Sequence, residues 1–156
     1  MLPYRAFLAG DHDRAAHMVA ALRAAVDAGD EKTLKVILET GELVDLDVIR
    51  AAAETAIRNG ADFIKTSTGK TPTSATLAAT GVMLDVIRTT DPAVGLKPSG
   101  GIRTLADATA YLAQADKIMG PQWATAATFR FGASGLLTAL EAAIDGDTTV
   151  ASKGAY

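Results

Sequence analysis

Short apolar runs alternate with longer amphipathic stretches along this chain. Residues 34–39, 62–66 and 93–97 are short runs rich in apolar residues, and they predict buried strands. Residues 129–132 predict a fourth strand. An alternation of strands and helices of this kind is typical of a parallel sheet covered by helices.

The stretches around these runs carry apolar residues at helical spacing. In one of them Ile49 and Ala52 belong to a single stripe, and Asp45 is placed to cap the first turn. Thr104 is placed to cap a later helix, with Asp107 at its third position. The predicted helices are residues 13–28, 45–59, 74–88, a helix beginning near Thr104, and 135–145.

Equivalent strand positions recur at Lys35, Lys65 and Lys97, at intervals of 30 and then 32 residues. This interval is the length of a βαβ unit, which open doubly wound sheets and closed barrels both contain. Parity favours the barrel, because small and polar residues alternate with apolar ones along the strand 93–97. Apolar residues on one face and polar or small residues on the other are typical of strands that line a barrel.

The composition indicates one globular domain. Of 156 residues, 49% are hydrophobic and 21% are charged, and the chain has no cysteine, which excludes disulfides and cysteine nucleophiles. The net charge is −3 and the sequence has no run of basic residues, so it gives no sign of a surface that binds nucleic acid or an anionic membrane. No apolar run approaches the roughly 20 residues of a membrane span, so we expect a cytoplasmic protein. We expect His12 and His17 to be surface residues rather than metal ligands.

Two lysines end buried strands and predict a catalytic pair. Lys65 and Lys97 are each followed by hydroxyl or glycine residues, at the edge of the sheet where active sites of α/β proteins lie. A second cation lowers the pKa of a lysine, and a neutral lysine is a nucleophile for a carbonyl group. Lys35 shares their parity but lies early in its strand, so we expect it to reach solvent at the lower rim.

Glycine loops follow the last two predicted strands. Residues 99–104 run directly into a helix, so backbone N–H groups and the positive helix end can hold a phosphate. Residues 132–135 repeat this arrangement, and paired loops after the last strands are a recurrent phosphate site of barrels. Arg103 and Lys70 are placed to add positive charge.

Two carboxylates and one loop segment are not interpreted as catalytic groups or as a nucleotide-binding site. Glu39 and Asp62 are carboxylates near the strand ends, and we expect Glu39 to form a salt bridge with a lysine. The segment 67–71 is similar to the end of a nucleotide P-loop, but Ile64 stands where that motif requires glycine. We therefore exclude ATP and GTP binding.

Four segments together resemble the deoxyribose-phosphate aldolase family, which are class I aldolases on a (β/α)₈ barrel. The resemblance extends over nearly the whole chain and is carried by residues 34–40, 63–69, 96–104 and 131–134. It implies that residues 1–146 form the C-terminal half of such a barrel, with four parallel βα units and a leading helix. Residues 147–156 are expected to be a mobile tail, since they lack apolar periodicity.

The resemblance implies reversible cleavage of 2-deoxy-D-ribose 5-phosphate to D-glyceraldehyde 3-phosphate and acetaldehyde, without metal or another cofactor. It assigns Lys65 to the Schiff base, Lys97 to lowering the pKa of Lys65 and assisting proton transfer, and Tyr156 to proton movement. Gly135 stands where the family often has a serine, so one phosphate contact is expected to be lost. The residues assigned to substrate binding are Lys35, Thr68, Gly69, Lys70, Gly100, Gly101, Arg103, Gly132 and Ser134.

The resemblance covers only part of a barrel, which takes about 250 residues. The family's catalytic aspartate precedes the position of Met1, so neither it nor the first three strands has a counterpart in this sequence. A half barrel exposes strand edges and its inner face. Three interpretations follow: a fragment of a longer protein, which the abrupt start of the match favours; two copies that close one barrel; or a separate chain that supplies the missing half.

The main functional hypothesis is an enzyme descended from aldolases that binds a small phosphorylated sugar. Two alternatives remain. The missing aspartate suggests a catalytically silent phosphate-binding or scaffold domain. A different Schiff-base aldolase or a transaldolase is the other alternative, and donor aldehydes distinguish it. We expect neither nucleic acid nor a membrane as a partner.

Overall fold

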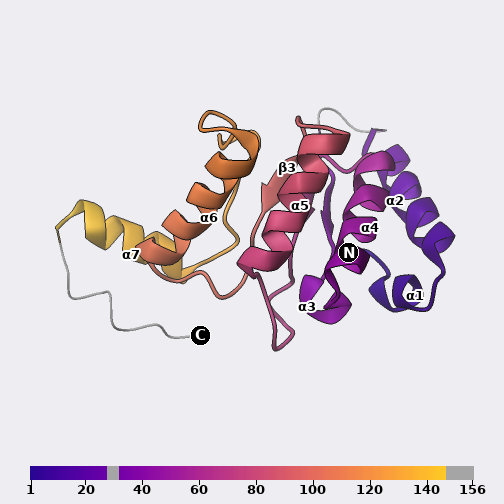
Figure 1. Ribbon diagram of the computed structural model, residues 1–156, viewed down its shortest axis with the longest axis horizontal. Helices are drawn as coiled ribbons and strands as arrows, with labels where there is room; N and C mark the ends of the chain where they lie inside the picture. Colours follow the sequence, from indigo (N-terminus) through magenta and orange to yellow (C-terminus); the bar gives the residue numbers. More distant parts are fainter. Residues whose placement is uncertain (28–31, 147–156) are drawn as a thin grey trace.

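Three short parallel strands and the helices between them form the fold of the computed structural model, which describes residues 1–27 and 32–146. The strands β1 (Lys35–Ile37), β2 (Phe63–Lys65) and β3 (Gly95–Lys97) pair in that order. Figure 1 shows the units following one another along the long axis of the molecule, from α1 and α2 at one end to α6 and α7 at the other. The helices are α1 (Tyr4–Leu8), α2 (His12–Asp27), α3 (Thr40–Leu43), α4 (Leu46–Arg58), α5 (Leu77–Thr90), α6 (Leu105–Met119) and α7 (Gly135–Ile144).

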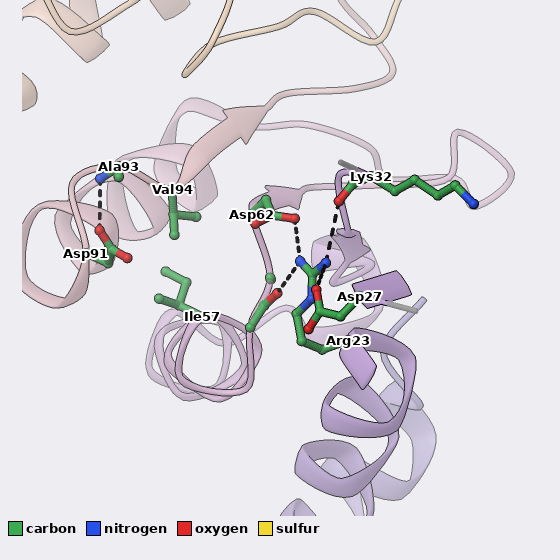
Figure 2. A pocket seen from close by; sticks show the side chains of 10 residues that line it. Arg23, Asp27, Lys32, Ile57, Asp62, Asp91, Ala93 and Val94 are labelled. Atoms are coloured by element: carbon green, nitrogen blue, oxygen red, sulfur yellow. Dashed lines mark hydrogen bonds and ion pairs between the residues drawn. The ribbon is translucent and has the colours of Figure 1, made fainter. Parts of the chain in front are cut away.

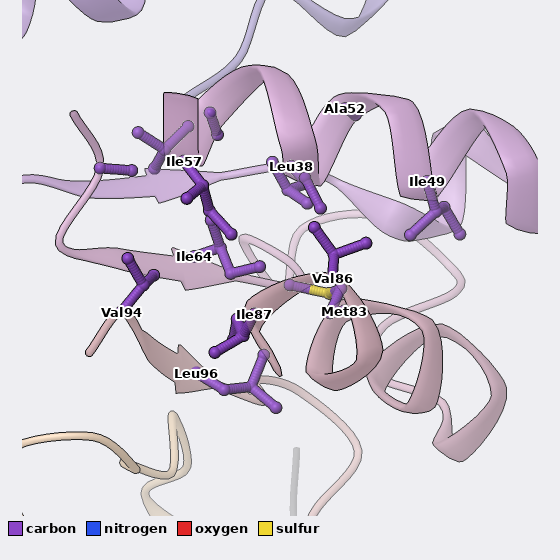
Figure 3. Packing of buried hydrophobic residues seen from close by; sticks show 14 of the residues in the cluster. Leu38, Ile49, Ala52, Ile57, Ile64, Met83, Val86, Ile87, Val94 and Leu96 are labelled. Carbon is purple, nitrogen blue, oxygen red and sulfur yellow. The ribbon is translucent and has the colours of Figure 1, made fainter. Parts of the chain in front are cut away.

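The core lies between one face of the sheet and the helices α4 and α5. Val36, Ile64 and Leu96 alternate with the lysines along the strands, and all three are buried. Each fully buried aliphatic side chain of this size stabilises the fold by about 1.5–3 kcal/mol. Figure 3 shows strand side chains meeting those of the two helices, among them Leu38, Ile49, Ile57, Ile64, Met83, Ile87 and Leu96.

The predicted helix caps of α4 and α6 are confirmed. The Asp45 side chain accepts hydrogen bonds from the first backbone N–H groups of α4, which have no partner within the helix. Thr104 and Asp107 form a reciprocal capping box at the start of α6. Both signals are local, which is why the sequence alone can place these two helix starts.

Helix α5 begins later than predicted. Its cap is Thr76, whose hydroxyl accepts the N–H of Ala79, rather than Ser74. The preceding chain is held elsewhere, because the N–H of Ala75 donates to the carbonyl of Ser99 at 3.2 Å. A tertiary contact with the loop after β3 therefore replaces the first predicted turn of the helix.

The prediction of a fourth strand at residues 129–132 is wrong, because this segment forms only isolated bridges with the chain of β3. Hydrogen bonds of a parallel ladder are present, with the N–H of Arg130 donating to Leu96 at 3.1 Å and that of Gly132 donating to Pro98 at 2.8 Å. The ladder is interrupted because Pro98 has no N–H to donate. Three strands and a bridged segment thus replace the four predicted units, and the sheet does not close into a barrel within this chain.

Two short helices, α1 and α3, have no signal in the sequence periodicity. They contain five and four residues, too few to show a repeating apolar stripe. The start of the chain also covers part of the sheet edge, because the N–H of Leu2 donates to the carbonyl of Ile37 at 2.8 Å. Within the described residues, none of the helices has the length and apolar character that crossing a membrane requires.

Candidate active site

Lys65 and Lys97 lie side by side at the carboxyl edge of the sheet. They end β2 and β3, and the parallel register pairs one with the other. Both are partly buried, on the face opposite the helix-covered core. Lys35 shares this face but pairs with Phe63, so it lies two residues farther from the carboxyl edge along its strand.

The pKa of Lys65 is lowered from its ordinary value of 10.5. Burial is the largest cause, because it penalises the charged form of an amine. The neighbouring Lys97 lowers the pKa further, in the direction predicted from the sequence, and Glu39 opposes both effects. The fraction of neutral, nucleophilic amine at a given pH is therefore larger than for an exposed lysine.

Lys35 is partly buried and lies over an aromatic ring. Its Nζ is 5.2 Å from the centroid of the Phe63 ring, and the Cζ of Arg130 is 4.6 Å from the same centroid. Burial lowers the pKa of Lys35, as do the charges of Lys97, Arg130 and Lys65. Arg130 was not among the predicted site residues, and its place on this cationic face follows from its contact with the Phe63 ring.

Gly95 makes room for the ring that these cations contact. A Cβ atom at Gly95 would overlap three atoms of the Phe63 ring. Phe63 is buried, at 3% exposure, on the face opposite the main core. The missing side chain at Gly95 therefore lets an aromatic ring fill the inner face below the two catalytic candidates.

The loops after β2 and β3 approach each other closely. Gly69, Gly100 and Gly101 have φ values of 80°, 84° and 81°, a conformation that favours glycine. A Cβ atom at Gly100 would lie 2.6 Å from the Cβ of Ser74 and 3.7 Å from the Cα of Gly69. The structure therefore brings two of the predicted phosphate-binding residues, Gly69 and Gly100, close together.

The segment after the bridges joins the same edge. The Ser99 hydroxyl donates to the carbonyl of Gly132 at 3.1 Å, and a Cβ atom at Gly132 would lie 3.1 Å from the Cε of Lys97. Thr66 ties the neighbouring loop to this one, because its Oγ1 accepts the N–H of Ser99 at 3.0 Å. Three chain segments thus converge around Lys97.

Glu39 does not form the predicted salt bridge with a lysine. Within the described residues its carboxylate instead accepts hydrogen bonds from Thr68, through the N–H at 3.1 Å and the hydroxyl at 2.6 Å, and from the Thr71 hydroxyl at 3.4 Å. Glu39 is only 2% exposed. A buried carboxylate needs several donors, and hydroxyl and N–H groups of the next loop supply them here.

Asp62 belongs to the opposite edge of the sheet and not to this site. It accepts the N–H of Leu34 at 2.7 Å and forms an ion pair with Arg23 at 2.7 Å. Figure 2 shows this ion pair beside a pocket of about 470 Å³ at the amino ends of the strands. The position of Asp62 before β2 rather than after it explains why its carboxylate lies away from the two lysines.

The remaining predicted site residues are exposed or lie outside the described part of the chain. Lys70 and Arg103 are exposed, and no ion pair involves either of them in the described part of the chain. Ser134 is exposed at the start of α7, and its side chain does not cap that helix. Tyr156 lies outside the described residues. His12 and His17 are exposed on α2, as expected.

Comparisons with known proteins find similar aldolases. A profile described as DeoC/LacD family aldolase matches residues 4–142. A deoxyribose-phosphate aldolase from Agrobacterium fabrum is 57% identical over 137 residues, which are 88% of this chain and 52% of that protein.

Two solved structures are similar over most of the chain. A candidate deoxyribose-phosphate aldolase from Toxoplasma gondii, in its apo form, is 30% identical with a TM-score of 0.79, over 89% of this chain and 54% of its own. Another candidate, from Coccidioides immitis, is 27% identical with a TM-score of 0.76, over 92% and 50%. The chain therefore spans about half the length of these relatives.

Proposed function

The chain belongs to the DeoC/LacD family of aldolases, and we propose that it carries the Schiff-base part of a deoxyribose-phosphate aldolase site, with Lys65 as the nucleophile. The register pairing of Lys65 with Lys97 at the carboxyl edge is the observation that carries this proposal. The identity of 57% with the Agrobacterium fabrum aldolase supports the choice of substrate.

The chemistry needs a neutral amine in a partly water-excluded place. The nitrogen of Lys65 attacks the aldehyde carbon of the open-chain sugar, and loss of water gives a protonated imine. The electrons of the bond between C2 and C3 then move into the imine as that bond breaks, and the C3 hydroxyl loses its proton. Protonation of the resulting enamine and hydrolysis release acetaldehyde and restore the amine.

The glycine loops supply the proposed site for the 5-phosphate. Gly69 and Gly100 adjoin one another, and the loop that contains Gly100 leads into the first turn of α6. Backbone N–H groups and a positive helix end favour an anion there. Lys70 and Arg103 are exposed beside this point and would add positive charge.

A silent phosphate-binding domain is the second candidate. One observation favours it: within residues 1–27 and 32–146, no carboxylate forms an ion pair with Lys65 or Lys97. Such a domain would bind phosphate without cleaving the sugar.

Acetaldehyde release from 2-deoxy-D-ribose 5-phosphate distinguishes the two candidates. We expect the full chain to release acetaldehyde above the level of a Lys65→Met variant, which retains the length of the side chain but not the amine. Release equal to that of the variant, together with a phosphate-induced rise in Tm, would favour the silent domain.

A further inference from the structure

Glu39 is a buried carboxylate to which the proposed chemistry gives no part. It follows β1 with φ of 60° and ψ of 59°, a left-handed conformation that is strained for residues other than glycine. It is also only 2% exposed. A strained and buried acid at a sheet edge indicates that its side chain does something that glycine could not.

The partners of Glu39 all belong to the loop after β2. Both carboxylate oxygens are engaged, by the N–H and hydroxyl of Thr68 and by the hydroxyl of Thr71. Hydrogen bonds to an ionised acceptor are stronger than neutral ones. The loop after β2 also touches α3 at Gly41, where a Cβ atom would overlap the carbonyl group of Thr73.

The fixed position of Thr68 determines where the next residue lies. Gly69 follows it directly, and the Cα of Gly69 lies 3.7 Å from the place that a Cβ atom on Gly100 would occupy. The hydrogen bonds of Glu39 therefore set the spacing between the two loops that the proposed function gives to the phosphate.

We propose that Glu39 is a positioning residue that holds the loop of residues 68–71 against Gly100 and thereby sets the affinity of the site for phosphate. This inference rests on the proposed function, because it concerns the same phosphate site. Glu39 acts through Thr68 and does not touch the phosphate itself.

The test measures the affinity of the full chain for inorganic phosphate by calorimetry. We expect Glu39→Ala to weaken binding at least about tenfold, because it removes every hydrogen bond that the carboxylate accepts from Thr68 and Thr71. Glu39→Gln keeps one acceptor oxygen and should weaken binding less, and Thr68→Val should weaken it by removing the hydroxyl donor. Asp62→Asn is the matched control, because Asp62 also accepts a backbone N–H but lies at the opposite edge.

Several outcomes would overturn the proposal. They are a wild-type chain that does not bind phosphate, Glu39→Gln and Thr68→Val variants that bind it as tightly as the wild type, or an Asp62→Asn control that weakens it equally. The two milder variants decide the matter if Glu39→Ala does not fold.

Reductive trapping of acetaldehyde on Lys65 in the same proteins separates this inference from the proposed function. Because Glu39 raises the pKa of Lys65, Glu39→Gln should also shift the pH profile of trapping to lower pH, which a purely structural role would not do. No trapping together with a phosphate affinity that depends on Glu39 refutes the aldol chemistry alone. Trapping together with an affinity independent of Glu39 refutes the positioning role alone.

Discussion

The pKa of Lys65 is lowered by two effects of its surroundings that act in the same direction. Burial lowers its pKa most, and the charge of Lys97 lowers it further. The sequence allowed the pairing of these lysines to be predicted, because both end apolar runs one βα unit apart. It did not allow the partners of Glu39 to be predicted, because they depend on a left-handed backbone and on a loop 29 residues away.

Lys97→Met should shift the activation of Lys65 to higher pH. Removal of the neighbouring cation raises the pKa of Lys65, although burial still holds it below its ordinary value. The rate of reductive trapping of acetaldehyde at Lys65, measured against pH, should therefore reach half its maximum at higher pH. An exposed lysine on α6 provides the control, Lys117→Met, and an identical profile for both variants would contradict the electrostatic role of Lys97.

Lys65→Met should stabilise the chain near neutral pH. Below the lowered pKa of Lys65 both the folded and the unfolded states are protonated, and the folded state bears the full penalty of a partly buried charge. That penalty decreases as pH rises through the lowered pKa and vanishes above about 10.5, where neither state is charged.

Thermal unfolding of the variant and the wild type across this pH range tests whether the substitution stabilises the chain. We expect the Tm of the variant to be higher than that of the wild type near neutral pH, because the variant does not bury the charge. The difference should diminish as pH approaches 10.5. A variant that is less stable than the wild type at neutral pH would contradict the account.

At the scale of elements, hydrogen-bond ladders and close packing determine where strands form. The three strands of the sheet were predictable from their apolar runs and their spacing. The interruption of the pairing between residues 129–132 and β3 was not predictable. It depends on which residue faces Pro98 across the ladder, because Pro98 has no N–H to donate. The observed strands β1, β2 and β3 are also shorter than predicted, with three residues each.

Gly95→Ala should destabilise the sheet. Its new Cβ atom would overlap the Phe63 ring, and overpacking of this kind costs about 1–3 kcal/mol. Phe63→Leu should relieve part of this loss, so the double variant should be more stable than the sum of the two single changes predicts. Denaturant unfolding measures all three variants.

Gly135→Ala is the control for this prediction, because an added Cβ atom at that position meets nothing within 4 Å. A Gly95→Ala variant as stable as Gly135→Ala would show that the ring is not confined by β3. A double variant whose loss of stability equals the sum of the two single losses would lead to the same conclusion.

At the scale of the whole molecule, the inner face of the sheet is cationic. The charges of Lys97, Arg130 and Lys65 lower the pKa of Lys35, and that of Lys97 lowers the pKa of Lys65. The one acid that acts on Lys65 among the described residues, Glu39, is buried and engaged with Thr68. Two copies that closed a barrel through these faces would bring eight cations together. Like charges at such an interface repel each other, so the face does not favour pairing with itself.

Light scattering at two ionic strengths tests this expectation. We expect the mass of a monomer, 16.0 kDa, at low salt, and any association through the inner face should increase as salt screens the charges. A dimer that is tightest at low salt would contradict the argument and restore the two-copy barrel.

Reductive trapping with acetaldehyde and borohydride tests the central claim most directly. We predict an N-ethyl group on Lys65 that is far more abundant than on exposed Lys117 in the same digest. In the Lys65→Met variant, none of the remaining lysines should be ethylated preferentially. Ethylation of Lys65 no greater than that of Lys117 would contradict the assignment of Lys65 as the nucleophile.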